Sequence, residues 1–259
     1  MNLGLEGRKA IVCASSRGLG RACALALARE GVTVVVNGRD VERVEATAAE
    51  VRSATGADVI AVAADLCVED GRQRLLAACP EPDILVTNNG GPAPGRFEDW
   101  DHDVWLAALE QNLLAPVLLI RAVIGGMRVR RFGRIVNITS AMVKSPHPLM
   151  GLSTAARSAL TAVCKGLSRE VARDNVTINN LLPERIDTDR QRFMAGLQAA
   201  ARGVSVEQAY EDIAASIAAN RLGTPDEFAA ACAYLCSAQA GFVSGQNLQI
   251  DGGSYVGLV

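Results

Sequence analysis

Aromatic residues are scarce in this sequence, and neither sign of charge dominates it. Only 4% of its 259 residues are Phe, Trp or Tyr, and the formal net charge at pH 7 is −2. A chain without excess cations has little means of releasing counterions from nucleic acid or of binding an anionic membrane. We therefore expect neither nucleic acid nor a membrane as a partner.

Long apolar runs and a signal peptide are also absent. No stretch approaches the length that crosses a bilayer. At the N-terminus, Arg8 and Lys9 directly precede a short apolar strand, which is not the pattern of a secretory signal. These absences predict a cytoplasmic location.

Cysteines spaced as metal ligands are missing as well. The chain has seven cysteines, and they are scattered over predicted strands and helices. Cys232 and Cys236 share one helix face, but two thiols with no histidine or third cysteine nearby are more often packed in a core than bound to a metal. We interpret the cysteines as reduced core residues and expect no metal site.

Short apolar runs alternate with segments of helical spacing along the whole chain. The apolar runs predict strands at residues 10–13, 32–36, 59–63, 83–86, 134–138, 176–181 and 247–250. The segments between them predict helices at 21–30, 41–53, 69–78, 104–124, 154–172 and 226–237. This order predicts a single-domain, Rossmann-like α/β fold: a doubly wound, parallel, seven-stranded sheet with helices on both faces and ligands at the carboxyl ends of its strands.

One segment, at about 187–220, departs from this alternation. It is rich in Ala, Gln and Arg and has helical spacing but no strand. It is too short to hold a core of its own, so a separate second domain is the weaker interpretation. We expect residues 1–259 to form one domain with a helical substrate flap at 187–220 that excludes water from the site.

A glycine-rich turn directly follows the first predicted strand and opens onto a helix. In residues 13–20, Cys-Ala-Ser-Ser-Arg-Gly-Leu-Gly, the glycines let backbone amides approach a pyrophosphate, and the helix N-terminus adds partial positive charge. A plain strand-to-helix turn is the alternative, but the position between the first strand and the first helix favours a dinucleotide site.

The end of the second strand distinguishes NADP from NAD. An acidic residue there bonds the ribose 2′-hydroxyl and repels a 2′-phosphate. This chain instead has Asn37, Gly38 and Arg39, followed by Asp40. Arg39, together with Arg17 of the glycine-rich turn, offers guanidinium groups suited to a phosphate, so we expect NADP(H) as the cofactor. Two solvated surface arginines are the alternative.

These motifs resemble the short-chain dehydrogenase/reductase family, and in particular its 3-oxoacyl-carrier-protein-reductase-like members. The family carries Thr-Gly-x-x-x-Gly-x-Gly at the turn, with Ala14 in place of its first glycine here, and Pro-Gly-x-x-x-Thr near residue 183, with Glu184 in place of the glycine. We expect Ala14 to keep the same backbone path if its φ need not be positive. The resemblance covers nearly all of the chain and implies a homotetramer. It implies cofactor contacts by Ala14, Ser15, Ser16, Arg17, Gly18, Leu19, Gly20, Arg39, Asp65, Leu66, Asn88, Gly90, Arg157, Pro183, Ile186 and Thr188.

The resemblance also identifies catalytic residues, and here the sequence departs from the family. Asn112 matches the family's helix-bending Asn, and Ser140 matches its catalytic serine. The family's Tyr-x-x-x-Lys, in which the phenol protonates the carbonyl oxygen, is replaced by Ser153 and Arg157. We expect Asn112, Ser140, Ser153 and Arg157 to form the catalytic set.

The source of the proton is therefore open at this point. His147 lies six residues before Ser153 and has the pKa range of a substitute acid, but an exposed loop histidine between two prolines is the favoured interpretation. The tyrosines Tyr210, Tyr234 and Tyr255 are remote in sequence, and only a fold-back of the flap would bring Tyr210 near.

The sequence favours an NADP(H)-dependent oxidoreductase that interconverts a small-molecule ketone and a secondary alcohol through an atypical active site. Loss of a general acid typically slows a reaction by about 10² to 10⁴ while the other contributions remain. Two alternatives stay open. One is a non-redox enzyme on this fold, such as a lyase, an isomerase or a dehalogenase, and the other is a catalytically silent nucleotide-binding protein.

Overall fold

The strands of the protein are short runs of Val, Ile and Leu, most of them buried on both faces, as expected of a parallel sheet between two layers of helices. The computed structural model describes residues 2–258. Its strands pair in parallel in the order β3-β2-β1-β4-β5-β6-β7. They are β1 (Lys9–Val12), β2 (Thr33–Gly38), β3 (Val59–Ala63), β4 (Ile84–Thr87), β5 (Gly133–Ile138), β6 (Val176–Pro183) and β7 (Asn247–Ile250).

This order confirms the predicted fold. The chain winds outward from β1 in one direction to β3 and then returns to β4 on the other side of β1. The carboxyl ends of β1 and β4 therefore flank the point where the winding reverses, which is where doubly wound sheets bind their ligands.

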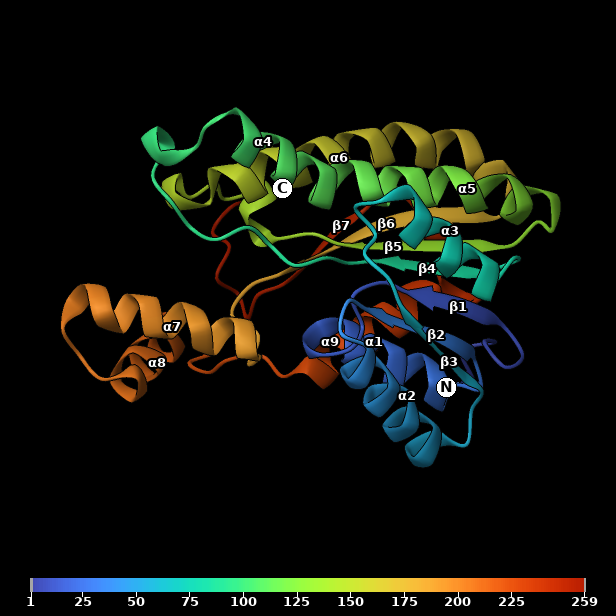
Figure 1. Cartoon of the computed structure of the whole chain (residues 1–259), viewed down its shortest axis with the longest axis horizontal. Helices are drawn as coiled ribbons and strands as arrows, with labels where there is room; N and C mark the ends of the chain where they lie inside the picture. Colours follow the sequence, from blue (N-terminus) through green and yellow to red (C-terminus); the bar gives the residue numbers. More distant parts are fainter. Residues whose placement is uncertain (1, 259) are drawn as a thin grey trace.

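Helices cover the two faces of the sheet in separate layers (Figure 1). Alternation along a strand divides the core in the same way: Ala10 and Val12 pack in one cluster, and Ile11 packs in the other. The first cluster includes α1 (Gly18–Arg29), α2 (Val41–Thr55) and α9 (Pro225–Cys236). The second includes α3 (Glu69–Ala78), α5 (Ala115–Val129) and α6 (Gly151–Val171).

The helix predicted over 104–124 is longer than expected and is not regular. It comprises α4 (His102–Leu109), a π-helical turn (Glu110–Leu114) that contains Asn112, and α5. π-helical turns widen a helix locally and are frequent at functional sites.

The same helix corrects the expectation that no apolar run is long enough to span a membrane. By length and composition His102–Val129 passes that test, with 28 residues and a mean hydropathy of 1.5 in its most apolar window. One such helix is weak evidence for a span, because a helix that covers a sheet passes as well. Leu119, Ile120 and Val123 pack in the core beside the sheet, which is the role this helix has in the fold.

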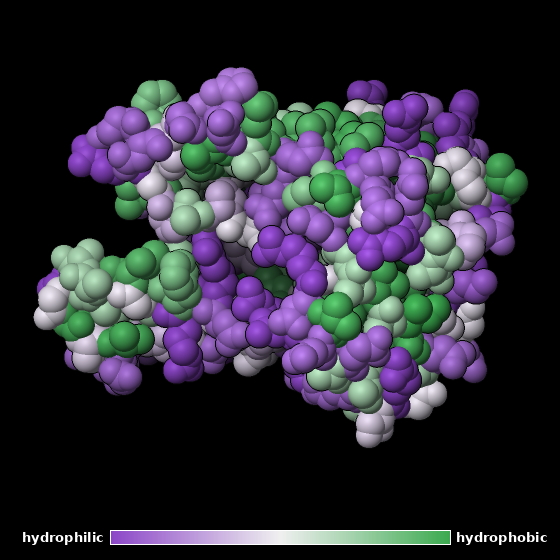
Figure 2. Space-filling model, in the orientation of Figure 1, coloured by the Kyte–Doolittle hydropathy of each residue, from purple (hydrophilic) through white to green (hydrophobic). Residues whose placement is uncertain are grey.

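Two helices project from the end of the sheet as a hairpin (Figure 1). They are α7 (Asp189–Arg202) and α8 (Val206–Ala215), and Gly203 ends α7 with a φ of 68°. The surface is deeply hollowed between this hairpin and the region of α4 (Figure 2). Phe193 and Leu197 are exposed on α7.

Candidate active site

The glycine-rich loop after β1 begins with a residue in a strained conformation. Ala14 has a φ of 45°, in the left-handed region, so the condition under which alanine was expected to keep the family's backbone path is not met. Two hydrogen bonds hold Ala14 there: its N–H donates to Asn37 Oδ1 at 3.1 Å, and its carbonyl accepts from Asn88 Nδ2 at 3.2 Å. For a residue with a β-carbon this conformation costs roughly 1–2 kcal/mol.

The two glycines of the loop serve different purposes. Gly18 has a φ of 56°, which glycine adopts without strain. A β-carbon on Gly20 would lie 2.4 Å from the Ala14 carbonyl oxygen, so only glycine permits this close approach. Helix α1 starts at Gly18 with no side-chain capping bond from Arg17, which leaves its first backbone amides for a ligand.

Asn37, at the end of β2, ties the glycine-rich loop to the sheet, and sequence reasoning missed this role. Besides its bond to Ala14, its amide nitrogen donates to the carbonyls of Val62 and Ala64, at 3.1 and 3.2 Å. Its backbone N–H donates to Ser15 Oγ at 2.9 Å. Ser15 is fully buried and its hydroxyl donates to Val12, so its side chain supports the loop from within.

Position 38 has no room for the acidic side chain that would select NAD. A β-carbon on Gly38 would lie 2.6 Å from Ser16 Oγ and 2.8 Å from a methyl group of Val44. Arg17 and Arg39 are both exposed and line one cleft, whose empty volume is about 830 Å³. That cleft brings together many of the predicted cofactor residues, namely Ala14, Ser16, Arg17, Arg39, Asp65, Leu66 and Gly90.

Ser153 and Arg157 form a buried pair at the carboxyl end of β5. They lie one turn apart on α6, and Arg157 Nε donates to Ser153 Oγ at 3.2 Å. Arg157 Nη1 donates to the carbonyls of Ile138 and Thr139, at 2.7 and 2.8 Å. Because the Ser153 oxygen accepts from the guanidinium, its own O–H is left to donate elsewhere.

Burial sets the charge properties of this pair. The two side chains are 3% and 8% exposed, and burial lowers the pKa of Arg157 to about 10, with a smaller contribution from the charge of Arg190. Arg157 is therefore still a cation at neutral pH, although in an environment that disfavours charge.

The other candidate residues differ in how they are held. Ser140 follows β5, and its Oγ accepts from the Met142 N–H at 3.2 Å. Asn112 is 3% exposed within the π-helical turn. His147 is exposed, and its Nδ1 accepts from the Leu149 N–H at 3.3 Å, which is the geometry of a ring protonated on Nε2.

The tyrosines of the hairpin and of the C-terminal segment have defined partners. Tyr210 on α8 donates a hydrogen bond to Asp187, and burial together with that carboxylate raises the pKa of Tyr210 to about 12. That makes it a weaker acid than an ordinary phenol. Tyr255 lies under Lys144, whose ammonium is 5.3 Å from the ring centroid. No local sequence signal predicts this contact, because the two residues follow different strands.

The segment after β6 leads into the hairpin. Thr188 caps α7 through a hydrogen bond that its Oγ1 accepts from Gln191, while Ile186 forms a single bridge with Gly223. Pro183 is paired with Ile250 in the sheet. These three predicted cofactor residues thus lie on a backbone held to β7 and to the base of α9.

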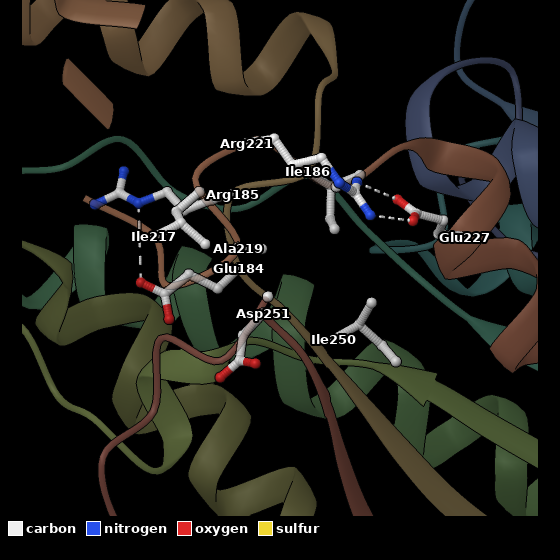
Figure 3. A pocket seen from close by; sticks show the side chains of 11 residues that line it. Glu184, Arg185, Ile186, Ile217, Ala219, Arg221, Glu227, Ile250 and Asp251 are labelled. Atoms are coloured by element: carbon white, nitrogen blue, oxygen red, sulfur yellow. Dashed lines mark hydrogen bonds and ion pairs between the residues drawn. The ribbon is translucent and has the colours of Figure 1, made fainter. Parts of the chain in front are cut away.

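A second cavity, with an empty volume of about 440 Å³, lies at the base of the hairpin and away from the glycine-rich loop. Figure 3 shows Glu184 and Asp251 on one side of it, with Arg221 paired to Glu227 on the other. Burial raises the pKa of Glu184, the charge of Arg185 opposes that shift, and Asp251 adds to it.

The cysteines also need one correction. A third thiol, Cys23 on α1, does contact Cys232, which lies near Cys236 on α9. Even so, no group of three or more Cys, His, Asp or Glu side chains among residues 2–258 is arranged to hold a metal ion. All three thiols are fully buried, which agrees with their interpretation as core residues.

A row of polar side chains crosses the sheet below the site. Thr87 donates to Asn137 at 2.7 Å, Asn137 to Asn180 at 2.9 Å, and Asn180 to Asn247 at 2.7 Å. These residues are direct neighbours in the register of β4, β5, β6 and β7. We call them the amide row.

Comparison with known proteins agrees with this architecture. A family described as enoyl-(acyl carrier protein) reductase matches residues 13–255. NADPH-dependent reductase BacG of Bacillus subtilis is 31% identical over 255 residues, covering 96% of this chain and 98% of that protein. The 3-oxoacyl-[acyl-carrier-protein] reductase FabG of Escherichia coli is 31% identical over 255 residues, covering 98% and 100%.

A solved structure resembles the whole chain. The L-sorbose reductase of Gluconobacter frateurii, crystallised with NADPH and L-sorbose, superposes with a TM-score of 0.94 at 27% identity, and the match covers 100% of both chains.

Proposed function

Because the chain belongs to the short-chain dehydrogenase/reductase family, we propose that it is an NADP(H)-dependent oxidoreductase that interconverts a ketone and a secondary alcohol, with Ser153 and Arg157 in the positions of the family's Tyr and Lys. The observation that carries this proposal is the hydrogen-bonded Ser153–Arg157 pair at the carboxyl end of β5. Its relatives include an NADPH-dependent reductase and a reductase crystallised with NADPH.

The residues of the cleft fit the cofactor. Gly20 lets the Ala14 carbonyl pack closely against the start of α1, and the N-terminus of α1 offers amides to a pyrophosphate. Gly38 excludes an acidic side chain, and Arg17 and Arg39 offer guanidinium groups to a 2′-phosphate. Asp65 and Leu66 lie in the same cleft, and we propose that they contact the adenine.

When bound, NADPH supplies the hydride. The residues of this chain then have to stabilise the negative charge that develops on the carbonyl oxygen. Ser140 and Ser153 donate hydrogen bonds to that oxygen. Arg157, which is hydrogen-bonded to Ser153 Oγ, stabilises the developing negative charge through its own positive charge. Asn112 lies in the π-helical turn, which packs against α6, the helix that carries Ser153 and Arg157. Since Arg157 does not release a proton at neutral pH, the proton comes from His147, from water or from the substrate.

Two further roles belong to this proposal. The α7–α8 hairpin, within residues 187–220, acts as a substrate flap, and its exposed Phe193 and Leu197 give it an apolar surface to close with. The protein assembles as a homotetramer, because α4 and α6 expose the apolar side chains of Val104, Leu106 and Val163.

The test compares Ser153→Ala and Arg157→Ala with Ser158→Ala, which removes a hydroxyl from the same helix. Turnover of NADPH with a panel of ketones is measured beside NADPH affinity from nicotinamide fluorescence. We expect Ser153→Ala to lower kcat by about 10² to 10³ with affinity unchanged, and Arg157→Ala to impair both.

The alternatives give different results. If the parent protein and the restored pair Ser153→Tyr with Arg157→Lys both bind NADPH yet reduce no ketone, the oxidoreductase proposal fails. A non-redox enzyme or a silent nucleotide-binding protein would then remain.

A further inference from the structure

Two arginines from different elements converge on the loop after β4. A β-carbon placed on Gly91 would lie 3.8 Å from Nη2 of Arg157 and 3.9 Å from Nη2 of Arg190, the second residue of α7. Each guanidinium thus lies within 4 Å of one point beside the reacting pair. The absence of a side chain on Gly91 keeps that point free.

Neither charge has an acidic partner. No Asp or Glu in residues 2–258 lies within ion-pair distance of Arg157 or Arg190, although fourteen ion pairs occur elsewhere. Burial lowers the pKa of both arginines, and Arg190 lowers that of Arg157 further. Two like charges held together cost free energy, which an anion between them would offset.

The hydrogen bonds of the two arginines leave donors for such an anion. Nε and Nη1 of Arg157 are taken by Ser153, Ile138 and Thr139. Its Nη2 bonds to none of the described residues. Arg190 Nη2 donates one hydrogen bond, to the Pro92 carbonyl at 2.9 Å, and its guanidinium lies 5.5 Å from the Phe193 ring, which leaves further N–H groups.

The geometry of the guanidinium also fixes where the anion lies. Nε and Nη2 share one edge of the planar group, with their N–H bonds nearly parallel. Because Nε donates to Ser153 Oγ, a group bound by Nη2 lies directly beside that hydroxyl. An anionic group bound there is therefore close to whatever Ser153 itself contacts.

We propose that Arg157 and Arg190 bind the carboxylate of the substrate, and that the substrate is an oxo acid with its ketone one or two carbons from the carboxylate. This inference rests on the proposed function, since it places the ketone on Ser140 and Ser153. Arg190 also joins the hairpin to the loop after β4, so binding of the carboxylate draws α7 toward the site. The pyrophosphate of the cofactor is the other anion that this pair could contact, and the experiment separates the two.

The first part of the experiment measures binding without turnover. The complex of the protein with NADPH is titrated with propionate and with propionamide, followed by nicotinamide fluorescence. We expect propionate to bind at least tenfold more tightly, and Arg190→Ala to weaken propionate about tenfold or more while changing NADPH affinity less than twofold. Arg192 lies on the same helix but stacks on Tyr210. Arg192→Ala therefore removes the same charge and should change neither propionate affinity nor NADPH affinity.

The second part measures turnover. kcat/KM for a 3-oxo acid should exceed that for its methyl ester in the parent, and Arg190→Ala should lower only the value for the acid. Arg190→Gln repeats the test with a side chain of similar length. If Arg190→Ala weakens NADPH as much as propionate, the pair binds the pyrophosphate and the inference is overturned.

The two proposals can fail separately. Equal kcat/KM for acid and ester overturns the carboxylate site while leaving the reductase intact. Binding of propionate that depends on Arg190, in a protein that turns over no ketone, supports the anion site and refutes the proposed function.

Discussion

Replacing Ala14 by glycine should stabilise the protein, although glycine usually weakens a structure. Ala14 has a φ of 45°, which costs a residue with a β-carbon roughly 1–2 kcal/mol. Glycine avoids that cost but loses more backbone entropy on folding, about 0.5–1 kcal/mol. The expected net gain lies between zero and about 1.5 kcal/mol. For a chain of this length, 1 kcal/mol raises Tm by about 2 °C.

The measurement is urea or thermal unfolding of Ala14→Gly beside Ala26→Gly. Ala26 lies within α1, where glycine should cost about 1 kcal/mol. The two substitutions are chemically identical, so changes of opposite sign in the free energy of unfolding would identify the backbone conformation at residue 14 as the cause. The N–H of residue 14 should keep its bond to Asn37, and NADPH affinity should be unchanged or better. Equal destabilisation by the two substitutions would refute the argument that Ala14 is strained.

Three other predictions follow from the cleft, the amide row and the second cavity. Arg39→Ala should weaken NADPH about tenfold or more and NADH little, because only NADPH carries the 2′-phosphate; equal loss of both in fluorescence titrations would show that Arg39 is merely a surface residue. Asn137→Ala should lower the free energy of unfolding in urea by about 2–4 kcal/mol, since it leaves Thr87 and Asn180 with buried, unpaired groups; a loss below about 0.5 kcal/mol would contradict this. Glu184→Gln should raise Tm at neutral pH but not at acidic pH. The pKa of Glu184 is higher in the folded protein than in the unfolded chain, so the carboxyl group favours folding when it is protonated. It loses that contribution as the pH rises through the folded-state pKa. A Tm gain of the same size at both values of pH would count against a buried carboxylate as the cause.

A further prediction is the oligomeric state. Light scattering at micromolar concentration should give the mass of a tetramer, and Leu106→Glu should shift the protein toward smaller species by placing a charge on the exposed apolar surface of α4. A monomeric parent protein would contradict the proposed assembly.

Much of the fold was accessible from the sequence because its signals are periodic and local. The strands at 59–63 and 247–250 and the helix at 69–78 have the predicted bounds. The helix at 104–124 was predicted too short, and its π-helical turn went unrecognised as secondary structure, because one inserted residue barely changes the hydrophobic pattern. Because the predicted helix was too short, the continuous apolar helix from His102 to Val129 was not recognised.

The site was less accessible because its contacts are between residues far apart in the sequence. The pair Ser153–Arg157 could be found, since it lies on one helix turn. The positive φ of Ala14 could not, because it is held by hydrogen bonds to Asn37 on β2 and to Asn88 in the loop after β4. The meeting of Arg157 with Arg190 has the same origin: it depends on where the hairpin folds back, which no local pattern encodes.

The amide row has a consequence for redesign of this protein. A slip of one residue between β5 and β6 would leave buried amides facing apolar side chains, so the row fixes the register of four neighbouring strands. The sheet thereby fixes the strands that carry the site, whereas α7 and α8 lie outside the sheet and contact the loop after β4 through Arg190. Replacing the hairpin by one of different length or composition should change substrate specificity without changing the geometry of hydride transfer.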